Sequence, residues 1–277
     1  MKHLDGQFKG RGDLNLYYQC WLSANEPKAI LLVVHGLAEH SGRYSNLVNY
    51  FVPRGYGVYG YDQRGHGKSD GLRGYVDRFS YFVDDLDIFL RLVHSRHHDS
   101  KIFLVGHSIG GTIATAYTIL HQGGFEGLIL TGATLNTPTD VAAITIFIAR
   151  ILSLILPKAG LYIIDAEAIS QDKNVVNAYV CDPLVYRGKI RARLGVELIK
   201  VMGTVKHQIS KIHLPILVMH GAADRLSDPK GSEMLYQKAS SVDKTLKVYE
   251  GYYHEILNEP GREQVLTDVE AWLKTHV

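Results

Sequence analysis

The sequence is poor in cysteine, in net charge and in long apolar runs, and each shortage excludes a class of protein. Its two cysteines, Cys20 and Cys181, are too few for a disulfide framework, and neither has the spacing of a zinc ligand. The 30 Lys and Arg residues against 28 Asp and Glu leave a formal charge of +2, with no long run of one sign. This balance predicts no nucleic-acid partner.

The sequence also shows neither an export signal nor a membrane span. The N-terminus, MKHLDG, does not continue into the apolar segment and small-residue cleavage site of a secretory signal. The longest apolar stretch, residues 141–156, contains Arg150 and is shorter than the roughly 20 residues that cross a bilayer. We therefore expect a cytoplasmic protein that can also lie peripherally on membranes.

Short apolar runs alternate with amphipathic helical patterns along most of the chain. With 46% hydrophobic residues, the chain can bury a large core. Apolar residues recur at helical spacing over 82–93 and 265–273. This alternation predicts an α/β fold with a mostly parallel central sheet flanked by helices. The expected strands are residues 30–35, 56–61, 102–106, 128–131, 216–220 and 246–249.

The strand rhythm stops between residues 133 and 206. Three helical patterns, 141–156, 175–179 and 194–205, occupy this block, and a strand pattern returns near residue 214. We predict a helical cap at 133–206, inserted into a core formed by 1–132 and 207–277. Polar residues are few in 141–156 and do not form a broad face, so we expect this helix to contact a membrane or micelle surface.

The segment Gly106-His107-Ser108-Ile109-Gly110 is a G-x-S-x-G motif between a predicted strand and a predicted helix. A sharp strand-to-helix turn needs glycines on both sides of the serine and exposes the hydroxyl at a helix N-terminus. Ser108 is therefore the candidate nucleophile. The amide of Ile109 is a candidate oxyanion donor, and a second donor should come from the loop after residues 30–35.

A serine hydroxyl needs a base and an orienting acid, which follow in the order acid, then histidine, in this type of site. Asp224 comes soon after the strand 216–220, and His254 comes soon after the strand 246–249. Asp228 is the alternative acid. His220 and His213 are the alternative bases. His254 is preferred because only it follows the last predicted strand.

The sequence resembles the monoacylglycerol lipase branch of the α/β-hydrolase superfamily. The matching segments are HGLAEHSGRY (35–44), DQRGHGKSDG (62–71), VGHSIGG (105–111), DPLVYRG (182–188), PILVMHGAADRLSDPKGS (215–232) and KTLKVYEGYYHEILNE (244–259). They follow one another in the family's order over nearly the whole chain. The resemblance implies a catalytic triad of Ser108, Asp224 and His254, and a cap over an acyl-binding tunnel.

The resemblance also implies finer roles. It assigns the second oxyanion amide to Leu37, and a glycerol-binding pocket to Glu39 and Arg43, with His107 and Tyr179 as weaker candidates. This sequence departs from the family at three places. Ile109 stands where methionine is frequent, and Tyr186 and Ser227 stand where mammalian members carry cysteines. Sensitivity to thiol reagents is therefore not expected to carry over.

No cofactor is expected. The run Gly65-His66-Gly67-Lys68-Ser69 ends like a phosphate-binding loop, but Asp62 stands where that motif needs glycine. The histidines at 97–98 have no companion ligands at metal spacing. The sequence thus predicts a serine hydrolase of monoacylglycerols or similar single-chain lipid esters. A lysophospholipase or general carboxylesterase is the alternative, and a non-catalytic interaction protein on the same fold is a more distant one.

Overall fold

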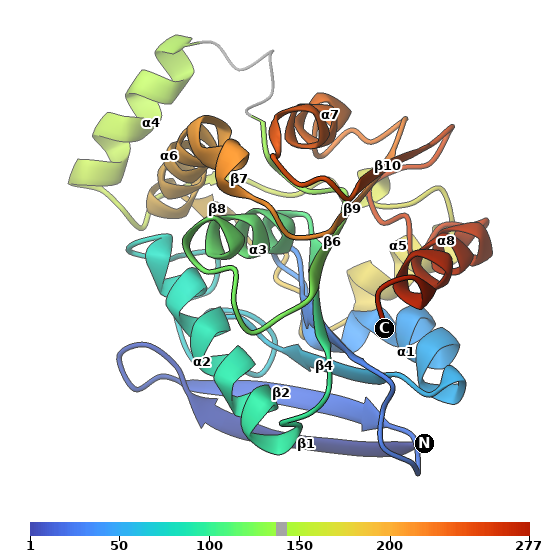
Figure 1. The fold of residues 1–277 in the computed structure, drawn as a ribbon. Coiled ribbons are helices and arrows are strands. Elements are labelled where there is room, and N and C mark those ends of the chain that lie inside the picture. Colours follow the sequence, from blue (N-terminus) through green and yellow to red (C-terminus); the bar gives the residue numbers. More distant parts are fainter. Residues whose placement is uncertain (137–142) are drawn as a thin grey trace.

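The computed structural model describes residues 1–136 and 143–277. Its main sheet has eight strands: β1 (Lys2–Lys9), β2 (Asn15–Leu22), β3 (Ile30–Val34), β4 (Gly57–Tyr61), β5 (Ile102–His107), β6 (Gly127–Thr131), β9 (Ile216–Gly221) and β10 (Lys244–Tyr249). They lie in the order β1-β2-β4-β3-β5-β6-β9-β10 (Figure 1). All neighbours from β4 to β10 are parallel, whereas β1 pairs antiparallel with β2, and β2 with β4.

All six predicted strands are present, and their ends agree within two residues. The hairpin of β1 and β2 was not predicted. Most of the edge strand β1 is exposed, and its sequence KHLDGQFK is largely polar, so it lacks the apolar run that marks a buried parallel strand. Strand β2 carries a clearer signal, because five of its eight residues are buried.

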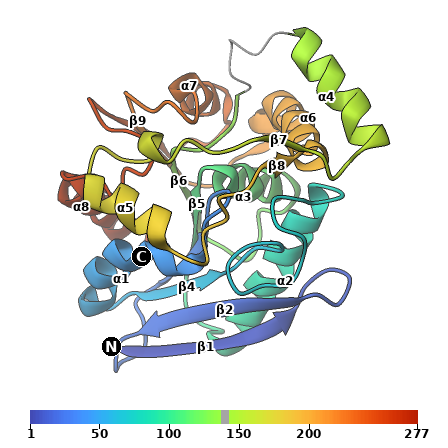
Figure 2. The same cartoon turned by 180° about the vertical axis from the view of Figure 1, so that it is seen from behind.

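Helices cover both faces of the sheet (Figures 1 and 2). The helices outside the insertion are α1 (Ser45–Phe51), α2 (Ser80–Arg96), α3 (Ile109–Leu120), α7 (Pro229–Lys238) and α8 (Arg262–Lys274). Strand β3 shows how the core divides, because successive side chains point to opposite faces. Ile30, Leu32 and Val34 pack with α2 and α3, whereas Leu31 and Val33 pack with α1 and α8.

The chain between β6 and β9, which we call the insertion, is mostly helical, and the predicted cap at 133–206 falls within it. Its elements are α4 (Ala143–Ile155), β7 (Gly160–Tyr162), the 3-10 helix η3 (Ala166–Ala168), α5 (Lys173–Cys181), β8 (Ile190–Arg191), α6 (Ala192–Gln208) and the 3-10 helix η4 (Ile209–Lys211). The predicted helix 141–156 corresponds to α4, except that residues 141–142 lie outside the described part. The small antiparallel sheet of β7 and β8 was not predicted.

One helix of the insertion, α6, packs against the core. Helix α6 buries Leu194, Met202 and Val205 in the same cluster as α2 and α3. Helix α4 packs on α6, on its side away from the main sheet (Figure 1). Within residues 1–136 and 143–277, no helix combines the length and the apolar character needed to cross a bilayer.

Candidate active site

Ser108 occupies a sharp turn between β5 and α3. Its backbone has φ 55° and ψ −123°, a conformation that is costly for a residue with a side chain. The flanking glycines allow the turn. A Cβ on Gly106 would lie 2.7 Å from Gly111 Cα, and one on Gly110 would overlap the carbonyl oxygen of Val34. The G-x-S-x-G spacing therefore has a steric cause.

Asp224 lies just beyond the end of β9, and its side chain is fully buried. Its Oδ2 accepts hydrogen bonds from His254 Nδ1 (2.7 Å) and Ser227 Oγ (2.8 Å), and lies 3.0 Å from His220 Nε2. Its Oδ1 accepts from the backbone amides of Leu226 (2.7 Å) and Ser227 (3.0 Å). Burial acts to raise the pKa of Asp224, but the charges and hydrogen bonds of His254 and His220 lower it well below its usual value. Asp224 is thus an anion with a fixed orientation.

His254 follows β10 and is directed by Asp224. Burial acts to lower the pKa of the imidazole, but the charge and hydrogen bond of Asp224 outweigh it, and the pKa is raised above 6.5. Ser108 and His254 line the same cavity. The hydrogen bond of Ser108 Oγ goes to Thr134 Oγ1 (3.4 Å), so the hydroxyl must turn toward the imidazole before it can transfer a proton. Such contacts often tighten only when substrate binds.

None of the three alternative residues, Asp228, His213 and His220, has the position of a triad member. Asp228 caps the N-terminus of α7, where it accepts from the Lys230 amide at 3.0 Å. His213 is exposed. His220 is buried at the end of β9 between Ser232 Oγ (2.7 Å) and Asp224, so it contacts the acid rather than the nucleophile. That contact with Asp224 was not predicted.

The cavity beside Ser108 has a volume of about 240 Å³. The insertion supplies an apolar wall, and the loops after β3 and β10 supply a polar one. Arg43 is the one predicted site residue, apart from the buried Asp224, that does not line it. The lining residues are Gly36, Leu37, Glu39, His107, Ser108, Ile109, Thr134, Tyr162, Ile163, Ile164, Asp165, Ile169, Tyr179, Leu198, Leu226, His254 and Glu255.

The two predicted oxyanion donors are both available. In the described part of the chain, neither the amide of Leu37 nor that of Ile109 donates a hydrogen bond. The loop that carries Leu37 is fixed on both sides: Glu39 Oε1 accepts from the Gly36 amide (2.5 Å), and Ala38 has a φ of 67°. The two amides can therefore serve a new acceptor without breaking an existing bond.

Arg43 does not line this cavity but contacts two carboxylates that do, and its predicted part in a glycerol-binding pocket stays a prediction. Its guanidinium lies between two carboxylates, 3.0 Å from Glu39 Oε2 and 2.5 and 2.8 Å from the two oxygens of Glu255. The ring of Tyr179 lies 4.8 Å from Arg43 Cζ, and Tyr44 donates to Glu39 at 2.8 Å. Arg43 therefore positions the carboxylates of Glu39 and Glu255, which line the cavity. Glu255 was missed, although it directly follows His254.

His107 is placed by the end of β6 and faces the base. Its Nδ1 lies 2.9 Å from the carbonyl oxygen of Thr131, and its ring centroid lies 4.7 Å from that of His254. Burial and the nearby His254 lower the pKa of His107. His107 is therefore a neutral side chain of the cavity wall at pH 7.

Comparison with known proteins agrees with this geometry. The family model described as serine aminopeptidase, S33, matches residues 25–261. The chain belongs to this family of hydrolases. It is 35% identical to the monoacylglycerol lipase of Mycolicibacterium smegmatis, over 98% of this chain and 96% of that protein. It is also 35% identical to the human monoglyceride lipase, over 97% and 88% of the two chains.

A solved structure extends the similarity to three dimensions. A soluble variant of the monoglyceride lipase of Saccharomyces cerevisiae, in complex with a substrate analog, superposes with a TM-score of 0.88 at 26% identity, covering 98% of this chain and 95% of that one. The resemblance to the monoacylglycerol lipase branch, stated from the motifs, is thereby confirmed, and so is the α/β-hydrolase fold.

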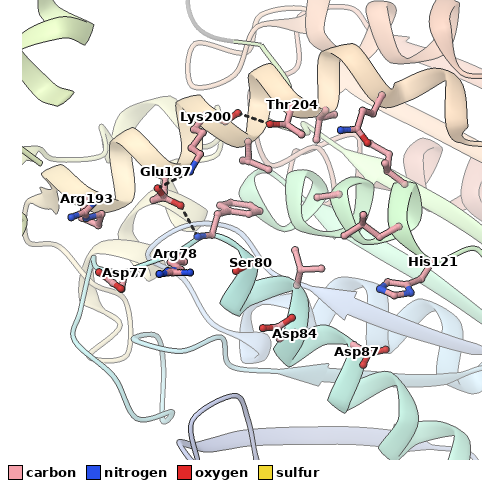
Figure 3. A pocket seen from close by; sticks show the side chains of 18 residues that line it. Asp77, Arg78, Ser80, Asp84, Asp87, His121, Arg193, Glu197, Lys200 and Thr204 are labelled. Atoms are coloured by element: carbon pink, nitrogen blue, oxygen red, sulfur yellow. Dashed lines mark hydrogen bonds and ion pairs between the residues drawn. The ribbon is translucent and has the colours of Figure 1, made fainter. Parts of the chain in front are cut away.

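A larger cleft of about 710 Å³ lies between α2, α3 and α6 (Figure 3). Its charged side chains largely balance: acidic Asp84 and Glu197 alternate with basic Arg78 and Lys200, and Glu197 lies 3.7 Å from Lys200. No predicted site residue lines this cleft. The larger of these two cavities is therefore not the one that contains Ser108 and His254.

Proposed function

We propose that this chain is a serine esterase that cleaves monoacylglycerols into fatty acid and glycerol through an acyl-enzyme. The observation that carries the proposal is a single cavity that joins Ser108 and His254 to an apolar wall from the insertion. An uncharged, single-chain ester fits such a cavity, because its glycerol end needs polar contacts and its acyl end needs apolar ones. The similarity to monoacylglycerol lipases supports the same substrate class.

In this mechanism, His254 accepts the proton of Ser108 as Oγ attacks the ester carbonyl. Asp224 accepts a hydrogen bond from Nδ1–H of the imidazole, which leaves Nε2 free as the base, and it then stabilises the imidazolium. The amides of Leu37 and Ile109 donate to the oxygen that becomes negative.

The imidazolium of His254 then protonates the departing glycerol oxygen, and the ester oxygen bond breaks to leave the acyl group on Ser108. A water molecule gives its proton to the same imidazole and attacks the acyl carbon. Collapse of this second intermediate releases the fatty acid and returns the proton to Ser108. Every proton and electron pair is moved by groups of the chain, the substrate or water, so the mechanism needs no cofactor.

The acyl chain must extend past the cavity. A volume of about 240 Å³ is below the roughly 300–1,000 Å³ of typical ligand sites, so it encloses the ester and the glycerol end rather than a long chain. Ile163 and Leu198 of the insertion form part of the apolar wall of the cavity, where the chain would begin. Each methylene buried there would contribute about 0.8 kcal/mol. We therefore propose that residues 133–206 act as a cap along which the chain lies.

The cap also offers an exposed apolar surface for lipid. Leu154 and Ile155 of α4 are 73% and 71% exposed, and Leu156 and Ile163 nearby are more than half exposed. Such side chains are stabilised when they enter a bilayer interface. We propose that this surface docks a cytoplasmic enzyme on the membranes that dissolve its substrate.

Docking is tested by the double variant Leu154→Ser, Ile155→Ser, with Val242→Ser as the control. Val242 is fully exposed but lies between α7 and β10, away from α4. We expect the double variant to bind phosphatidylcholine vesicles about tenfold more weakly, with turnover of a water-soluble ester unchanged. Equal vesicle binding by the double variant and the wild type would reject the docking surface.

The activity is tested by comparing three substrates: a monoacylglycerol, lysophosphatidylcholine and nitrophenyl butyrate. We expect the highest kcat/KM for the monoacylglycerol. A preference for lysophosphatidylcholine would favour the lysophospholipase alternative, and a preference for the butyrate would favour a general esterase. A folded protein that failed to react with a fluorophosphonate probe would favour a non-catalytic role.

A further inference from the structure

Three acidic side chains, and no basic one among the described residues, face the cavity on the side that we assign to the glycerol end. Glu39, Glu255 and Asp165 line the cavity, and no Lys or Arg does so among the residues that the structure describes. Asp165 is exposed at the mouth. Glu39 and Glu255 are buried, so solvent screens their charge poorly.

One guanidinium serves both buried carboxylates. Arg43 bonds to Glu39 and, through two nitrogens, to Glu255. The two-nitrogen geometry with Glu255 is that of an ionised carboxylate. Burial acts to raise the pKa of Glu39, but Arg43 and its other neighbours lower it to about 2. Two anions and one cation therefore leave one negative charge uncompensated beside the cavity.

The other groups around the ester do not supply the missing positive charge. His107 is neutral at pH 7, because burial lowers its pKa. His254 is balanced by Asp224, which is ionised. The backbone amides of the candidate oxyanion site are dipoles aimed at the carbonyl oxygen and carry no net charge.

The carboxylate of Glu39 lies close to the nucleophile. An atom at the Cβ position of Gly36 would be 2.8 Å from Glu39 Oε1 and 3.1 Å from Ser108 Cβ, so the carboxylate oxygen is within about 6 Å of Ser108 Cβ. The phosphate of a glycerol phosphate ester bound at Ser108 would therefore share this small cavity with the carboxylate. Repulsion over such distances is strong where water is excluded.

We infer that Glu39 and Glu255, held together by Arg43, make the cavity selective for an uncharged glycerol and exclude single-chain esters that carry a phosphate beside the ester. This inference rests on the proposed function and names the headgroup charge that the site accepts. The same wall repels the fatty-acid carboxylate once it is released from Ser108, and so favours product release.

A matched pair of substrates tests the inference directly. Monooleoylglycerol and oleoyl lysophosphatidic acid share the acyl ester and differ by a phosphate in place of one hydroxyl. Both are presented in neutral detergent micelles, so that the surface charge of the particle is set by the detergent. We expect kcat/KM of the wild type to be at least a hundredfold lower for the phosphate ester.

The variant Glu255→Gln removes one charge while keeping the size of the side chain and an oxygen for Arg43. We expect it to raise the ratio of lysophosphatidic acid to monooleoylglycerol kcat/KM about tenfold, whereas Glu255→Asp, which keeps the charge, restores the low ratio. Glu263→Gln, which removes an exposed charge from α8, is the control and should leave the ratio unchanged.

Product inhibition tests the same charge on the wild type, independently of whether Glu255→Gln folds. We expect oleate to inhibit at least tenfold more weakly than oleamide, which has the same chain and no charge. Equal hydrolysis of the two esters, an unchanged ratio in folded Glu255→Gln, or equal inhibition by oleate and oleamide would each overturn the inference. Failure to hydrolyse monooleoylglycerol at all would instead reject the proposed function.

Discussion

The substitution Asp224→Asn should inactivate the protein while leaving its fold intact. An asparagine has one carbonyl oxygen and one NH2 group, and the site decides which way round it sits. The backbone amides of Leu226 and Ser227 donate to Oδ1 of Asp224 at 2.7 and 3.0 Å, so the asparagine oxygen must take that position. Its NH2 group then takes the place of Oδ2, which accepts from His254 Nδ1 in the wild type. In the variant, Nδ1 must therefore accept a hydrogen bond instead of donating one.

That orientation gives His254 the wrong tautomer. When Nδ1 accepts from the asparagine, the imidazole proton moves to Nε2, and Nε2 can no longer take a proton from Ser108. The same change in other serine hydrolases lowers kcat by about 10⁴, which corresponds to about 5.5 kcal/mol of lost transition-state stabilisation. We expect a loss of this size here.

The assay is steady-state hydrolysis of a monoacylglycerol, with thermal unfolding measured on the same samples. Asp228→Asn is the matched control, because it makes the same chemical change at the N-cap of α7 and should retain activity. If Asp224→Asn kept more than a tenth of the wild-type kcat while Asp228→Asn lost activity, the assignment of the acid would be refuted.

Three further outcomes follow from the same contacts. Ser108→Ala should lower kcat by roughly 10⁴ to 10⁶ in single-turnover assays of a folded protein; near-normal turnover would exclude Ser108 as the nucleophile. The base must be neutral, and Asp224 raises the pKa of His254, so kcat/KM should fall with decreasing pH through a midpoint above 6.5; a midpoint near 5 would contradict this. Arg43→Met should lower the free energy of unfolding by about 3–5 kcal/mol in urea, because it strands two buried carboxylates; an unchanged midpoint would show that they are not charged.

Most of the strands that the sequence predicted are buried on both faces, with β10 as the exception, because only one of its six residues is buried. In β3 and β5 every residue is buried, so both faces demand apolar side chains and the strands read as continuous hydrophobic runs. The edge strand β1 is mostly exposed, so its side chains need not be apolar. The short strands β7 and β8 are held by only a few residues of pairing, which leaves no periodic pattern to read.

Candidate catalytic residues were found because their positions depend on chain order. A parallel sheet brings the ends of its strands to one edge, so the serine, the acid and the histidine could be placed by counting strands. The side chains that contact these residues could not be predicted in this way. His220 and Ser227 meet Asp224 because of the shape of one loop after β9, and no spacing in the sequence encodes that shape.

Arg43 shows that the sequence around a charged loop residue does not identify all its partners. Glu39 lies four residues before Arg43, but a buried guanidinium between two carboxylates also needs a partner from elsewhere in the chain. Its second partner, Glu255, lies 212 positions along the chain and directly after His254. The ion pair therefore ties the loop of the candidate oxyanion amide, through the contact of Glu39 with the Gly36 amide, to the loop of the candidate base. Breaking it should loosen the alignment of the oxyanion amide with the imidazole, so kcat should fall more than KM rises.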